Sequence, residues 1–154
     1  MSITTTTHLN FRGTARQALE FYQTVFGGVV ATMTYGDFGM PAEAADASKV
    51  VFGRLESDNG FRIMAFDVPG GGSADNRPQA GMTRREHGMT FTDQTFFQSL
   101  QAQSLDELSA YWEALAEGGE VIEPLAASPW SAGFGMVTDR FGVTWVLDVQ
   151  SEED

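Results

Sequence analysis

The sequence contains no cysteine and only two histidines. The absence of cysteine excludes a disulfide framework, a zinc–thiolate site, an iron–sulfur cluster and a cysteine nucleophile. No apolar run approaches the ~20 residues that a helix needs to cross a bilayer. The opening residues also lack the basic segment followed by an apolar stretch that is typical of a secretory signal. We therefore expect a cytoplasmic protein.

Basic residues are scarce as well. The 9 Lys and Arg residues are outnumbered by 21 Asp and Glu residues, which gives a formal net charge of -12. This charge repels nucleic acid and anionic membranes, so we expect neither as a partner. The 154 residues include 42% hydrophobic and 12% aromatic residues, enough to bury a core and to argue against disorder. The length fits one domain or two half-size units that share a core.

The first half of the chain has the order strand, helix, strand, strand, strand. Residues 15–26 carry apolar side chains at helical spacing, with Thr14 as a candidate N-cap and Gly27 at the end. The segments with strand patterns are residues 4–11, 29–35, 49–56 and 61–68. The last two are joined by residues 57–60, whose Asn-Gly pair favours a tight hairpin turn.

The second half repeats this order. Ser104 and Glu107 form a capping box at the start of a predicted helix, which glycines stop at 118–119. The strand candidates are residues 95–102, 121–124, 130–138 and 143–149. When the chain is shifted by ninety positions, apolar residues of the two helices coincide and Gly28 falls on Gly118. The match, together with the strand order, predicts a duplication.

Residues 69–92 are the least regular stretch, with three consecutive glycines and Pro78. We interpret them as a linker loop between module one, residues 1–68, and module two, residues 93–150. The chain's only concentration of basic residues lies here; it consists of Arg77, Arg84, Arg85 and His87. A solvated loop explains these residues better than an anion site does.

Several segments carry a resemblance to a known family. They are residues 8–11, 15–22, 25–28, 105–119 and 134–143. These segments resemble the PhnB-like proteins of the vicinal oxygen chelate superfamily, which includes glyoxalase I and the bleomycin-resistance proteins. The resemblance covers nearly the whole chain. It implies an α+β fold, a single glyoxalase-like domain over residues 1–154, in which two duplicated βαβββ modules form a curved, cup-like mixed sheet with helices outside. It also implies a homodimer.

The metal-dependent members of the superfamily place one His, Glu or Gln ligand on each of four strands. The resemblance puts these positions at His8 and near Arg54, Phe97 and Val146. His8 can bind a metal, but Phe97 and Val146 have no donor atom and Arg54 carries a permanent positive charge. One imidazole does not make a divalent site, so we predict no bound metal and no cofactor.

The same resemblance predicts which side chains line the cup. They are His8, Asn10, Arg54, Phe97, Ser99, Gln101, Trp130, Phe134, Val146 and Asp148. Strand alternation turns Trp145 away from Val146, so that one faces the helix and the other the cup. An apolar cup with a few polar anchors suits a small molecule that is anionic or bears a carbonyl group.

Two of these residues have alternative interpretations. Arg54 either anchors the ligand or pairs with Glu56 or Asp148 at the rim. His8 is a candidate general base, helped by Asn10 or Asp148, although a single histidine at the start of a strand is more often structural.

Three functions remain open from the sequence. The first is a metal-free protein that binds a small organic molecule, as the bleomycin-resistance proteins do. The second is a metal-dependent lyase, isomerase or dioxygenase, which the missing ligands disfavour. The third is a structural dimer whose cup is filled by its own side chains. Some PhnB-like proteins are named as ubiquinone methyltransferases, but no glycine-rich nucleotide loop supports that activity here.

Overall fold

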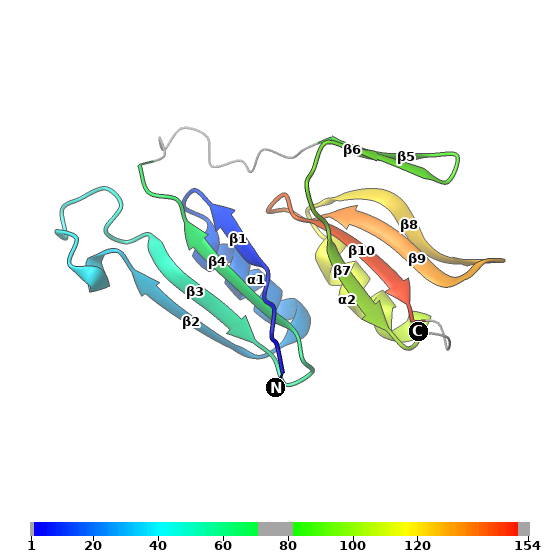
Figure 1. Ribbon diagram of the computed structural model, residues 1–154, viewed down its shortest axis with the longest axis horizontal. Helices are drawn as coiled ribbons and strands as arrows, with labels where there is room; N and C mark the ends of the chain where they lie inside the picture. The colour runs from blue at the N-terminus through cyan, green and yellow to red at the C-terminus, as the bar shows by residue number, and fades with distance from the viewer. Residues whose placement is uncertain (1, 71–81, 151–154) are drawn as a thin grey trace. The chain divides into compact units, whose positions relative to one another are not determined.

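The computed structural model describes residues 2–70 and 82–150. The chain divides into two compact units, Met1–Pro78 and Gln79–Asp154, and each contains one βαβββ module (Figure 1). The duplicated α+β fold predicted from the sequence is therefore confirmed. We describe each unit by itself.

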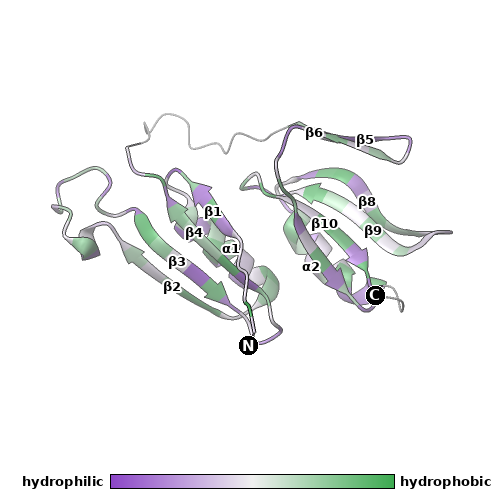
Figure 2. Cartoon of the chain, in the orientation of Figure 1, coloured by the Kyte–Doolittle hydropathy of each residue, from purple (hydrophilic) through white to green (hydrophobic). Residues whose placement is uncertain are grey.

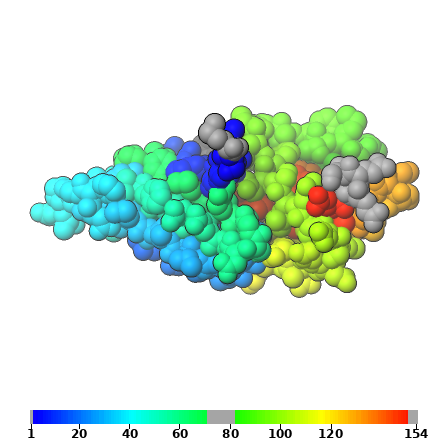
Figure 3. Space-filling view, turned by 60° about the horizontal axis from the view of Figure 1, so that its bottom comes forward, coloured from blue at the N-terminus to red at the C-terminus, as the bar shows by residue number. Residues whose placement is uncertain are grey.

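The first unit contains one four-stranded mixed sheet in the order β1-β4-β3-β2. Its elements are β1 (His8–Phe11), α1 (Ala15–Phe26), β2 (Val29–Thr34), η1 (Gly36–Phe38), β3 (Val50–Glu56) and β4 (Arg62–Asp67). Strands β1 and β4 are parallel, and the other pairs are antiparallel. The loop between β2 and β3, which carries the short helix η1, projects from the rest of this unit (cyan in Figures 1 and 3).

The second unit repeats this topology with the strand order β7-β10-β9-β8. Its module consists of β7 (Gln98–Ala102), α2 (Leu105–Ala116), β8 (Glu120–Ser128), β9 (Ser131–Thr138) and β10 (Thr144–Val149). The parallel pair is again the first strand with the last, β7 with β10. Strand β8 is longer than the predicted 121–124 and passes through Pro124. An edge strand tolerates proline because its outer side needs no donor.

A hairpin of β5 (Thr83–Glu86) and β6 (Met89–Thr92) precedes this module. It lies inside the segment 69–92 that the sequence predicts as a linker loop, so the loop interpretation is wrong for its last ten residues. The two strands flank a turn in which His87 and Gly88 have φ values of 54° and 76°. Such positive values build the tight hairpin turn. The predicted linker residues 71–81, with Arg77 and Pro78, lie outside the described residues.

Each helix packs on one face of its own sheet through a close approach at a glycine. Next to α1, a Cβ on Gly53 of β3 would lie 2.6 Å from the Leu19 side chain. Next to α2, a Cβ on Gly135 of β9 would lie 2.8 Å from the Trp112 ring. The side chains that fill the two cores are Leu19, Tyr22, Leu55, Ile63, Leu108, Leu115, Val137, Trp145 and Leu147.

A second pair of glycines fixes the crossing from each helix to its outer strand. A Cβ on Gly28, before β2, would lie 2.3 Å from the Glu56 carbonyl oxygen. A Cβ on Gly119, before β8, would lie 2.3 Å from the Thr138 carbonyl oxygen. The outer strand of each module therefore begins in close contact with the backbone of the neighbouring strand. Any side chain larger than that of glycine would clash there.

The two helices begin in different ways. Ser104 caps α2 as predicted, because its Oγ accepts a hydrogen bond from the Glu107 N–H at 3.2 Å. Thr14 is the N-cap residue of α1, as predicted, but its side chain makes no cap hydrogen bond. The buried Asp67 at the end of β4 takes over this role, since its Oδ1 accepts from the N–H groups of Gly13 at 2.7 Å and Ala15 at 3.0 Å.

Asp67 also binds the start of β3. Its second oxygen, Oδ2, accepts from the Val50 N–H at 2.9 Å. Asp67 is 2% exposed, and three backbone donors from two distant segments converge on its carboxylate. A buried carboxylate needs such partners, because losing them leaves an uncompensated charge.

Asp139 has the matching role in the second unit. Its Oδ1 accepts from the N–H groups of Phe141 at 2.8 Å and Val143 at 3.1 Å, and its Oδ2 accepts from Trp145 Nε1 at 2.9 Å. The neighbouring Arg140 donates twice to the Glu117 carbonyl oxygen at the end of α2. The sequence motif at residues 134–143 therefore has a structural role. Its Asp139 and Arg140 connect the β9–β10 turn to the core and to the end of α2 by hydrogen bonds.

We predict that Asp67→Asn lowers the free energy of unfolding by about 3 kcal/mol, because the amide group turns N–H donors toward a backbone N–H. Asp58→Asn, at an exposed turn position, is the control and is expected to cost less than about 0.5 kcal/mol. Urea unfolding followed by far-UV circular dichroism measures both. Fluorescence is unsuitable, since Trp112, Trp130 and Trp145 all lie in the second unit. Equal stability of the two variants would contradict the assigned role of Asp67.

Candidate functional site

Each four-stranded sheet has one face against its helix and an opposite face, which we call its open face. Buried and more exposed residues alternate along β4, where Ile63 and Ala65 face the helix and Met64 and Phe66 the open face. Figure 2 shows a corresponding change between hydrophobic and hydrophilic residues along β3 and β10. The predicted cup residues fall on these open faces, with the exceptions described below.

A row of register partners crosses the first open face. It runs from His8 on β1 through Met64 on β4 and Arg54 on β3 to Ala31 on β2. Asn10 lies two residues from His8, and its Oδ1 is 3.2 Å from His8 Nδ1. The His8 ring packs edge-on against Phe66 with ring centroids 5.2 Å apart. The structure thus brings His8, Asn10 and Arg54 onto one face, as the sequence predicts.

Arg54 forms the rim pair that was one of its two predicted roles. Its Nε lies 3.7 Å from Glu56 Oε1, and the two side chains are 48% and 51% exposed. An exposed ion pair of this length contributes between about 0 and 1 kcal/mol to stability. The pair is weak enough to open, so both roles of Arg54 are compatible with the structure.

A second row crosses the open face of the other sheet. It runs from Ser99 on β7 through Val146 on β10 and Met136 on β9 to Glu123 on β8. Gln101, two residues after Ser99, donates from Nε2 to Asp148 Oδ2 at 3.3 Å. Trp145 is fully buried on the helix side, which confirms that it turns away from Val146.

Two predicted cup residues lie outside the strands of this sheet. Phe97 precedes β7, and Ser99 occupies the register position beside Val146. Trp130 lies in the turn between β8 and β9 and is 90% exposed. Phe134 lies on the open face, but the Arg85 guanidinium covers its ring at 4.7 Å from the centroid.

The β5–β6 hairpin brings to this face residues that the sequence analysis assigned to a solvated loop. Thr90 Oγ1 lies 3.8 Å from Met136 Sδ, and Arg85 Nε lies 3.8 Å from Glu123 Oε2. The alternation of Met89–Thr92 after His87-Gly88 was the available signal for the hairpin, since Thr83–Glu86 is polar throughout. The partner of Arg85 was not readable, since it depends on how the hairpin packs on β8.

The donor atoms on the two rows do not fit a divalent cation. The register places Met64 rather than Arg54 beside His8, and Ser99 rather than Phe97 beside Val146. The first row offers one imidazole and one thioether, and the second offers a hydroxyl, a thioether and the Glu123 carboxylate. Taken by itself, each row is a poor set of ligands for Zn, Ni, Mn or Fe. Within residues 2–70 and 82–150, no group of three or more His, Asp or Glu side chains is placed to hold a metal.

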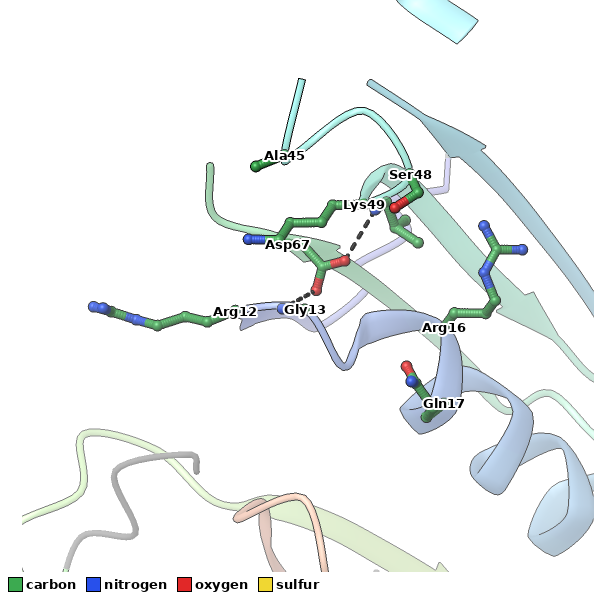
Figure 4. A pocket seen from close by; sticks show the side chains of 9 residues that line it. Arg12, Gly13, Arg16, Gln17, Ala45, Ser48, Lys49 and Asp67 are labelled. Carbon is green, nitrogen blue, oxygen red and sulfur yellow. Dashed lines mark hydrogen bonds between the residues drawn. The ribbon is translucent and has the colours of Figure 1, made fainter. Parts of the chain in front are cut away.

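A cavity of about 420 Å³ lies in the first unit beside the start of α1 (Figure 4). The Asp67 carboxylate lines it and is occupied by backbone donors. Arg12 and Arg16 extend away from that carboxylate in opposite directions. Lys49 pairs with Asp46 at 2.8 Å, and its hydrogen bond is the main cause that lowers the Asp46 pKa. These side chains do not converge on one point, so the cavity is a weaker candidate than the open faces.

Comparison with known families shows to which superfamily the chain belongs. A family model described as the Glyoxalase/Bleomycin resistance protein/Dioxygenase superfamily matches residues 7–147. The chain belongs to this superfamily. In this superfamily member the match spans both βαβββ modules and the hairpin between them, in agreement with the resemblance seen in the sequence.

Individual relatives cover almost the full length. Protein PA1353 from Pseudomonas aeruginosa has a similar structure with a TM-score of 0.72 and 33% identity, over 97% of this chain and 98% of that one. The PhnB protein from Bacillus cereus has a TM-score of 0.67 and 23% identity, over 96% and 100%. Protein YjdN of Escherichia coli (strain K12) is 24% identical over 153 residues, 95% of each chain.

We predict that the purified protein carries only substoichiometric amounts of transition metals, because its open-face rows lack a ligand set. Elemental analysis after dialysis measures the content. Addition of Ni²⁺ or Zn²⁺ and of a chelator is expected to leave the melting temperature unchanged, since a bound metal would stabilise the fold. A stoichiometric metal that His8→Ala removes would contradict this prediction.

Proposed function

We propose that this superfamily member binds a small organic molecule on the open faces of its sheets without a metal ion. The observation that carries the proposal is the mixed composition of the two open faces. They place apolar side chains, such as Met64, Phe66 and Val146, beside polar ones, such as Arg54 and Gln101. Sites for small organic molecules combine apolar surface with placed polar groups in this way. The superfamily name includes bleomycin resistance, a binding function of the same kind.

The proposal gives the polar groups definite roles. Arg54 supplies a positive charge for an anionic or carbonyl-bearing part of the ligand, by opening its 3.7 Å pair with Glu56. His8 and Asn10 offer a hydrogen-bonding pair on the same face. His8 is also the residue available as a general base, should the protein catalyse a reaction of its ligand.

The metal-dependent lyases, isomerases and dioxygenases remain the alternative from the same superfamily. The donor set of the described open faces disfavours them. A structural dimer with a filled cup is the second alternative, and one observation favours it for the second sheet. The hairpin residues Arg85 and Thr90 already contact Phe134 and Met136 there.

Arg54→Gln is expected to weaken binding of a ligand found by thermal shift in a panel of small organic compounds. At one hundred times its dissociation constant, a ligand stabilises the wild type by about 2.7 kcal/mol. The loss of one charge-assisted hydrogen bond weakens binding about tenfold or more. Arg16→Gln, on α1, is the matched control and leaves the shift intact. The proposal fails if no compound shifts the melting temperature, or if both variants respond alike.

We also propose a homodimer, as the resemblance implies. Its support is the apolar outer strand β2 of the first unit, where Val29 is 72% and Met33 43% exposed. Light scattering after size exclusion is expected to give twice the chain mass of 16.7 kDa. Val29→Glu combined with Met33→Glu should shift the protein toward the monomer, because burying two carboxylates in an interface is costly. A monomeric wild type would overturn this proposal.

A cytoplasmic location also stays a proposal. Among the described residues, neither α1 nor α2 is long and apolar enough to span a membrane. The absence of cysteine is compatible with a reducing compartment but does not require one.

A further inference from the structure

Arg85 is the most enclosed arginine for which an ion pair is described. It lies on β5, and its side chain is 18% exposed, whereas that of the neighbouring Arg84 is 56% exposed. The two residues point to opposite sides of the hairpin, as strand alternation requires. Arg84 lies over the Phe91 ring of the hairpin itself, and Arg85 lies over the Phe134 ring of the second open face.

The guanidinium of Arg85 uses its donors incompletely. Its NH1 group donates to Thr90 Oγ1 at 2.8 Å, and its NH2 group has a long contact with the Gly88 carbonyl oxygen at 3.4 Å. Its Nε is buried and has no hydrogen-bond partner within the described part of the chain. The Glu123 carboxylate, at 3.8 Å, is too far for a hydrogen bond. A buried donor without a partner is costly, so a ligand that accepts from it gains affinity.

The surroundings define what such a ligand looks like. Beside Arg85, the open face presents the Phe134 ring, the buried Met136 and the partly exposed Val146. The hairpin packs chiefly on the outer strand β8. We therefore place the entry of a ligand on the side of β10. Arg85 is paired with the Glu123 carboxylate. A second carboxylate, Asp148, is the register partner of Phe134 on β10 and accepts a hydrogen bond from Gln101.

We infer that Arg85 is the anion-recognising residue of a ligand site on the second open face, and that its ligand is a small organic anion with an apolar body. The inference rests on the proposed function and names its ligand class. A carboxylate, phosphonate or sulfonate accepts from Nε and NH2 of the guanidinium together, a geometry that suits arginine and not lysine. The apolar body contacts Met136 and Val146, and the anion displaces Glu123.

Two fluorescent probes test this inference. Anilinonaphthalene sulfonate is an aromatic anion, and phenylnaphthylamine has the same rings without the sulfonate. Titration of the wild type is expected to give tighter binding of the sulfonate. Arg85→Gln should weaken sulfonate binding about tenfold or more and leave phenylnaphthylamine binding unchanged. Arg85→Lys, which keeps the charge but not the forked donor geometry, should fall between the two.

Arg84→Gln is the matched control, since it removes the same charge from the adjacent position on the outer side of the hairpin. It is expected to change sulfonate binding by less than about twofold. Equal losses in Arg84→Gln and Arg85→Gln would mean general electrostatic attraction and would overturn the inference. Unchanged sulfonate binding in Arg85→Gln overturns it too, while binding of both probes by the wild type leaves the proposed function standing. If the wild type binds neither probe, both the inference about Arg85 and the proposed function are overturned.

A second variant keeps the test decisive if Arg85→Gln does not fold. Glu123→Gln leaves Arg85 in place and removes the carboxylate that competes for it. It is expected to tighten sulfonate binding severalfold and to leave phenylnaphthylamine binding as it was. Unchanged or weaker sulfonate binding in Glu123→Gln would contradict the inference.

Discussion

The buried carboxylate of Asp67 holds the first module together at the point where three segments meet. It receives backbone N–H groups from the start of α1 and from the start of β3, and it stands at the end of β4. These segments are far apart in sequence, and the carboxylate supplies acceptors that the backbone alone does not provide there. Asp139 does the same for the turn, the indole and the core of the second module. With the ends fixed in this way, each sheet presents one face to its helix and leaves the other for function.

The chemistry of the open faces follows from this arrangement, in which one face of each sheet packs on a helix and the other does not. Charge that holds the fold is concentrated in two enclosed aspartates, whereas the rows around His8 and Val146 have few ionised groups. A site with so few formal charges suits recognition of an organic body by contact, with single arginines for orientation. A transition-metal site needs several oxygen, nitrogen or thiolate donors. Met64 and Val146, the register partners of His8 and Ser99, supply none of these.

Much of the fold was readable from the sequence because its signals are local. The spacing of apolar residues set both helices correctly, and the capping box at Ser104 and Glu107 is present. The predictions that failed concern features that depend on contacts between residues far apart in the sequence. The sequence around Thr14 predicts that its side chain caps α1. The cap hydrogen bonds come instead from Asp67, fifty-three positions away, and no local sequence pattern predicts that contact. The hairpin was missed because its first strand, Thr83–Glu86, is polar throughout and shows no alternation.

The sequence pattern predicted which side chains share a face of the sheet, but not which of them are register partners. The shift of ninety positions holds for the helices, but the glycines that meet a neighbouring carbonyl, Gly28 and Gly119, differ by ninety-one. Register in a sheet is sensitive to such single-residue changes. In the β7–β10 pair, Ser99 and not Phe97 stands beside Val146.

The close contacts at Gly28 and Gly119 also make the two ends of each outer strand different. The end next to the glycine is fixed in position, and the far end is free to vary in length. Pairing is regular where β2 and β8 leave Gly28 and Gly119, and it becomes irregular farther on, after Met33 in one and after Val121 in the other. Insertions or deletions that lengthen or shorten these strands are therefore tolerated at their far ends and not at their beginnings. Among relatives, differences in the shape of the outer margin should accumulate there, while the helix-to-strand crossing keeps its length.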